Sequence, residues 1–135
     1  MADTRGWVRS KVVAGLVGLF AGGLTIMLIE SVGHGVFGTA DPGDLDAVTV
    51  PMFLSVLVAW TAGSGVAGAV ATYWSGASSG GLALGMGLIL LAGAIANMLV
   101  IPHPVWLVVA AVVLMPLSAW MAGRRLVAAG PAGAP

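Results

Sequence analysis

The chain has 135 residues, of which 59% are hydrophobic and only 7% are charged, and its five basic and five acidic residues cancel. Soluble domains are about 25% charged, so this composition excludes a water-soluble domain and indicates a membrane protein. Zero net charge excludes a basic field for nucleic acid. The absence of cysteine excludes disulfides, thiolate metal sites and cysteine nucleophiles.

Long apolar segments predict an all-α fold, a four-helix transmembrane bundle. An α-helix needs about 20 apolar residues to cross the hydrocarbon core. The first run exceeds the ~7–15-residue core of a signal peptide, which favours a membrane span over a cleaved leader. The predicted spans are about 12–31, 52–72, 82–101 and 105–122, in a single domain of residues 1–127 followed by a disordered tail, 128–135.

Polar and proline-rich segments separate these spans. The acidic segment 35–50 contains Asp-Pro-Gly-Asp, which is typical of a turn. Pro102 and Pro104 predict a break between the third and fourth spans, and Pro116 predicts a kink within the fourth. Trp60 lies roughly 13 Å deep at helical rise and is interpreted as a core aromatic residue.

Basic residues occur only before the first span and after the fourth: Arg5, Arg9, Lys11, Arg124 and Arg125. Short segments rich in Lys and Arg stay on the cytoplasmic side of a membrane. Both termini are therefore predicted to be cytoplasmic, which requires an even number of spans and agrees with four. We expect a multi-pass protein of the inner (plasma) membrane.

Glycines in the spans predict close helix packing, because small residues let helix backbones approach one another in lipid. The packing positions predicted are Gly18, Gly22, Gly63 and Gly85. The chain has 21 glycines, more than four short helices need internally. We therefore expect the lipid bilayer as one partner, and a homo-oligomer or a larger membrane complex.

The predicted topology brings four polar residues to one thin slab near the outer face: Glu30, His34, Asn97 and His103. If the first helix continues to His34, Glu30 and His34 lie on one helix face. One interpretation is structural, with the side chains tying the outer ends of the helices together. A second is a site for a proton or cation, because ionisable residues in spans are costly and indicate function.

A third interpretation is a metal site with Glu30, His34 and His103 as ligands, a set that suits zinc or iron. No HExxH-type motif accompanies these residues, so we predict no metal and no other cofactor. Nucleotide-binding and serine-hydrolase motifs are also absent, and no catalytic residue is predicted. An enzyme is therefore the less favoured class.

Two segments carry a family resemblance: I-E-S-V-G-H at 29–34 and A-N-M-L-V-I-P-H-P-V-W at 96–106. With the four-span layout, they resemble a group of small, functionally uncharacterised bacterial inner-membrane proteins. That group has a Pro-rich aromatic stretch after its Gly-His, where this chain reads Gly-Val-Phe-Gly at 35–38. The resemblance implies that Glu30, His34, Asn97 and His103 belong together, and it implies no activity.

The sequence thus predicts a small integral membrane protein that transports or senses a proton, cation or small solute through this polar cluster. The alternative is a non-catalytic accessory or structural subunit of a larger membrane complex.

Overall fold

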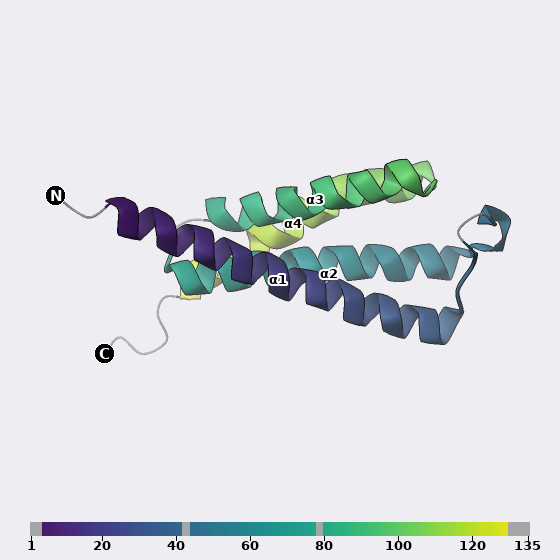
Figure 1. Cartoon of the computed structure of the whole chain (residues 1–135), viewed down its shortest axis with the longest axis horizontal. Coiled ribbons are helices and arrows are strands. Elements are labelled where there is room, and N and C mark those ends of the chain that lie inside the picture. Colours follow the sequence, from purple (N-terminus) through teal and green to yellow (C-terminus); the bar gives the residue numbers. More distant parts are fainter. Residues whose placement is uncertain (1–3, 42–43, 78–79, 130–135) are drawn as a thin grey trace.

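The computed structural model describes residues 4–41, 44–77 and 80–129, and their secondary structure is entirely helical. Figure 1 shows the long helices packed side by side. Each is long and apolar enough to cross a membrane, which confirms the predicted four-helix transmembrane bundle. The elements are α1 (Thr4–Phe37), the 3-10 helix η1 (Leu45–Ala47), α2 (Val50–Ser75), α3 (Gly81–Val100) and α4 (Val105–Ala129).

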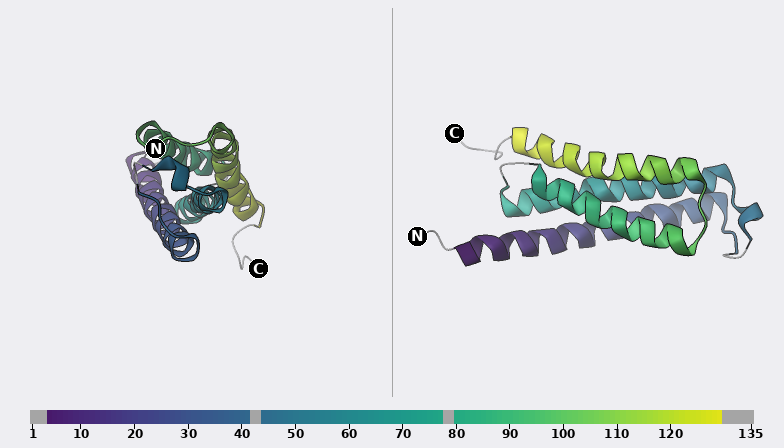
Figure 2. Two further views of the ribbon diagram at one scale, coloured as in Figure 1. Left: turned by 90° about the vertical axis from the view of Figure 1, so that its right-hand side faces the viewer. Right: turned by 90° about the horizontal axis from the view of Figure 1, so that it is seen from above.

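Successive helices run in opposite directions, so the start of α1 and the end of α4 lie at the same end of the bundle (Figures 1 and 2). We call this end the terminal end. The opposite end, which carries η1 and the α3–α4 turn, is called the distal end. Arg124 and Arg125 lie at the terminal end, whereas Asp41, Asp44 and Asp46 lie in the distal α1–α2 loop. The membrane side that each end faces remains a prediction.

Helix α1 is longer than the predicted span and continues past residue 31 to Phe37. Gly38 follows with φ 83°, and its N–H donates to the His34 carbonyl at 3.0 Å. This left-handed glycine is a common way to end a helix. Glu30 is therefore about two turns inside α1, and Glu30 and His34 share one helix face.

The other helix ends follow the local sequence. Pro51 lies in the first turn of α2, and Gly76 ends that helix in the left-handed conformation, with φ 60°. Helix α4 begins directly after Pro104 and runs through Pro116 without ending. Of the predicted tail, residues 128 and 129 are the last of α4, and 130–135 lie outside the described residues.

The backbones of α1 and α2 touch along a seam of small residues, which we call the glycine seam: Gly18, Gly22, Gly63 and Ala67. A Cβ atom added to Gly18 would lie 2.6 Å from the Ala67 carbonyl oxygen. One added to Gly22 would lie 2.6 Å from the Gly63 carbonyl oxygen. Only glycine permits this approach, so three of the four predicted packing glycines lie in close helix contact.

The fourth predicted packing position, Gly85, makes no close contact with another helix of the same chain. A Cβ added there would have no atom of another element within 4 Å. Gly87 instead carries the α3–α4 contact, since its added Cβ would lie 2.7 Å from that of Ala119. The two glycines are about 200° apart around the helix, and the sequence does not show which face of so apolar a helix meets α4.

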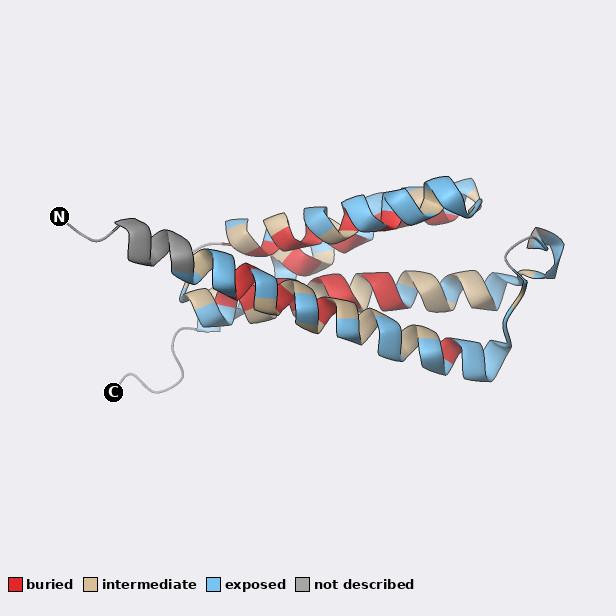
Figure 3. Cartoon of the chain, viewed as in Figure 1, coloured by how far each residue is buried: buried red, intermediate tan, exposed pale blue. Residues whose placement is uncertain are grey.

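Packing is uneven between the helices. Helix α1 lies along α2, and α4 packs against α2 and α3, whereas α1 and α3 touch only slightly. In Figure 1, α1 and α3 diverge toward the distal end. Buried residues gather where the helices face one another, and Figure 3 shows exposed residues along their outer surfaces. Large apolar side chains such as Phe20 are exposed there, as expected for a surface that contacts lipid.

The glycine seam can be tested with two matched alanine substitutions. Gly22→Ala should destabilise the bundle by about 1–3 kcal/mol, because the new methyl group meets backbone that cannot turn aside. Gly85→Ala should leave stability unchanged or raise it by up to about 1 kcal/mol, through helix propensity alone. Unfolding in detergent, followed by circular dichroism, measures both. Equal stability of the two variants would contradict the seam.

Candidate functional site

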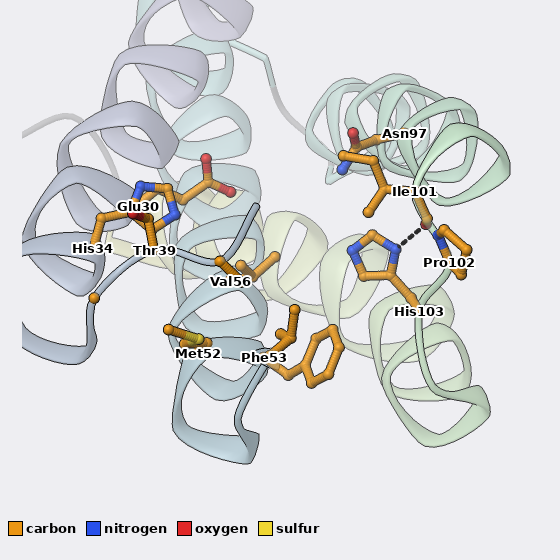
Figure 4. Close-up of a pocket in the computed structure, with 13 residues that line it drawn as sticks. Glu30, His34, Thr39, Met52, Phe53, Val56, Asn97, Ile101, Pro102 and His103 are labelled. Carbon is orange, nitrogen blue, oxygen red and sulfur yellow. Dashed lines mark hydrogen bonds between the residues drawn. The ribbon is translucent and has the colours of Figure 1, made fainter. Parts of the chain in front are cut away.

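A cavity of about 370 Å³ opens at the distal end, where α1 and α3 diverge. We call it the distal cavity. All four residues of the predicted polar cluster line it: Glu30, His34, Asn97 and His103. In Figure 4, Glu30 and His34 come from α1 on one side, and Asn97 and His103 come from α3 and the α3–α4 turn on the other. Helix α2 contributes Met52, Phe53 and Val56.

A second cavity of about 300 Å³, the inner cavity, involves residues deeper in the bundle. Its lining is mostly apolar and includes Ile26, Leu90 and Met115. Glu30 and Asn97 line both cavities, so they mark the boundary between them. Toward the terminal end, the glycine seam brings α1 and α2 into backbone contact. The two cavities therefore lie on the distal side of the tightest helix packing.

Glu30 has a specific partner within the bundle. The Trp60 indole nitrogen donates a hydrogen bond to Glu30 Oε1 at 3.1 Å. Trp60 is only 5% exposed, and a buried indole N–H needs an acceptor. An ionised carboxylate in apolar surroundings likewise needs donors or a counter-ion. The bond satisfies the indole N–H, gives the carboxylate one donor at Oε1, and ties α1 to α2 beside the cavities.

Three aromatic rings extend from Trp60 toward the distal end. The His103 ring lies 5.8 Å from the Trp60 ring and 5.9 Å from the Phe53 ring, between ring centres. Trp106 meets Phe53 edge-on at 6.4 Å. The Nδ1 atom of His103 contacts the carbonyl of Ile101, which can only accept, so this nitrogen carries the proton. That contact and the rings hold the imidazole against one wall of the distal cavity.

The four predicted residues surround one space but do not bind one another. Among the residues that the structure describes, no hydrogen bond joins any two of them. His34 and Asn97 are exposed, whereas Glu30 and His103 are half-buried. No group of three His, Cys, Asp or Glu side chains in the described ranges could hold a metal ion. Glu30, His34 and His103 therefore do not form a ready-made ligand set.

The sequence interpretation missed the role of Trp60, which it treated as a core aromatic residue alone. A usable indication was present: an indole N–H deep within a span needs an acceptor, and Glu30 is the only glutamate in the chain. What sequence cannot supply is the relative rotation of α1 and α2. That rotation decides whether the two side chains, thirty positions apart, meet.

Comparison with protein-family models, with curated proteins and with solved structures finds no match for this chain. The fold and composition define a small integral membrane protein. The resemblance of segments 29–34 and 96–106 to four-span bacterial inner-membrane proteins stays a prediction.

The hydrogen bond between Trp60 and Glu30 can be measured with a double-mutant cycle. Trp60→Phe removes the donor and Glu30→Leu removes the acceptor, and the double variant completes the cycle. We expect a coupling free energy of about 1–3 kcal/mol, as for hydrogen bonds to charged or desolvated groups. Thermal unfolding of the four proteins provides the values. Additive losses would show that the two side chains do not interact.

Proposed function

We propose that this membrane protein takes up a proton or a small cation at Glu30, from the distal end of the bundle. The observation that carries the proposal is the place of Glu30 at the boundary of the two cavities. Among the described residues that line the two cavities, Glu30 is also the only one with a carboxylate, and none is Lys or Arg. A cation that enters therefore finds one carboxylate, and His34 and His103 are the other titratable side chains of the described lining.

The chemistry follows from the surroundings of the carboxylate. Trp60 engages Oε1, and no other described residue donates to Glu30. Oε2 is not among the buried atoms without a partner, so it is accessible from the cavities. A proton or a cation that enters the distal cavity can therefore reach the carboxylate. The second oxygen, Oε2, is the atom that would receive either one.

The closed terminal side favours binding or sensing over conduction through a single chain. The glycine seam leaves no room for a side chain between the backbones of α1 and α2. The cluster of Ala67, Ala71 and Met86 adds a second packed layer on that side. Together with the predicted cytoplasmic termini, this arrangement makes Glu30 a receptor for a proton or cation that arrives from outside the inner membrane.

Charge entry can be followed as a current in proteoliposomes on a solid-supported membrane. A rapid change of pH or cation concentration should give a transient current, because charge enters a site within the membrane. Glu30→Gln should abolish the transient, since the amide still accepts from Trp60 but cannot take up the charge. Asp46→Asn, in the exposed distal loop, is the matched control and should retain it.

An unchanged transient in folded Glu30→Gln would reject the proposal and leave the accessory-subunit alternative. A sustained current that requires Glu30 would instead assign transport to the protein.

A further inference from the structure

We infer that the cation recognised beside Glu30 is a small organic ammonium ion, such as a trimethylammonium compound. The inference rests on the proposed function, since it names the class of cation that the same site takes. The distal cavity combines one carboxylate with aromatic and apolar walls. These features distinguish an organic cation from a proton and from a metal ion.

The distribution of charge favours a cation at the distal end. Glu30 is the acidic group inside the cavity. Asp41, Asp44 and Asp46 are exposed in the distal loop, where they add negative potential beside the opening. The described basic residues of α4 lie at the terminal end of the bundle. Such an arrangement raises the local concentration of cations and repels anions.

The aromatic wall selects for an organic cation. Phe53 and His103 line the distal cavity across from Glu30, and Figure 4 shows the His103 ring and the Glu30 carboxylate directed toward the space between them. The face of a phenyl ring such as that of Phe53 attracts ammonium groups, and the attraction grows when water is excluded. The His103 ring adds contact area to the same wall. The apolar side chains of Val56 and Ile101 supply further surface for methyl groups.

A metal ion fits this site poorly. Calcium and magnesium take six or more oxygen ligands, whereas the described side chains that line the cavity offer one carboxylate and two neutral oxygen-bearing groups, Thr39 and Asn97. No metal-binding group of three His, Cys, Asp or Glu exists in the described part of the chain. An alkylated ammonium ion needs only one counter-charge and apolar contact. The volume of about 370 Å³ is within the range of small-molecule pockets.

The inner cavity adds a place for an apolar substituent. Glu30 borders both cavities, so an ammonium group held beside it can direct one substituent inward. Ile26, Leu90 and Met115 would then surround that substituent. Ligands with one short alkyl or aryl group should accordingly bind more tightly than tetramethylammonium.

Choline tests the inference, because 3,3-dimethyl-1-butanol has the same shape without the charge. We would titrate both into the purified full chain in lipid nanodiscs and follow heat and tryptophan fluorescence. Choline should bind, and the uncharged alcohol should not compete with it. Glu30→Gln should weaken choline binding at least about tenfold, as expected when a desolvated counter-charge is lost.

A second pair of variants separates the aromatic wall from the charge. Phe53→Leu should weaken choline binding by roughly twofold to thirtyfold, the range of cation–π energies. Trp74→Leu, an exposed aromatic at the terminal end, should leave both choline binding and the pH-driven transient current unchanged. Circular dichroism establishes that both variants fold.

Two results would overturn the inference. One is equal binding of choline and the alcohol, which would make the cavity an apolar pocket. The other is no choline binding while the pH-driven, Glu30-dependent current persists, which would leave the proposed function standing. Loss of the Glu30 dependence of that current would contradict the proposed function itself.

Discussion

The backbone contact between α1 and α2 is the constraint on which the rest of the bundle depends. Gly22 and Gly63 bring the two helices together at a point where any side chain would separate them. This contact sets the rotation of α1 about its own axis, and that rotation turns Glu30 toward Trp60. Helix α1 packs along α2, and α3 packs along α4. The same contact therefore leaves α1 and α3 apart at the distal end. The cavities occupy the resulting space.

A carboxylate within a membrane span is unfavourable unless its surroundings compensate for the lost water. Here one indole supplies a single hydrogen bond, and the remaining surroundings are a cavity rather than packed side chains. Glu30 Oε2 has no hydrogen-bond partner among the described residues, and it is not one of the buried atoms without a partner. The carboxylate is therefore accessible from the cavities, which is the physical basis for proposing a ligand there. The Phe53 ring in the same lining is the basis for proposing an organic cation.

Hydropathy and charge predict the number of spans and the shared end of the two termini, because these properties depend on composition along the chain. The grouping of Glu30, His34, Asn97 and His103 also follows from topology alone, since each lies near the distal end of its segment. Details that depend on helix rotation do not follow. The sequence of α3 is apolar on almost every face, so it does not show which of Gly85 and Gly87 packs against α4. The Trp60–Glu30 bond and the continuation of α1 through two glycines require the folded bundle.

The central claim, that Glu30 borders a cavity open to the distal side, can be tested directly by cysteine accessibility. The chain has no native cysteine, so Asn97→Cys provides a single thiol at the boundary of both cavities. It should react with a membrane-impermeant thiol reagent added from the side opposite the termini. Ala67→Cys, at a fully buried position, should react from neither side. An unreactive Asn97→Cys, or reaction only from the terminal side, would contradict the account.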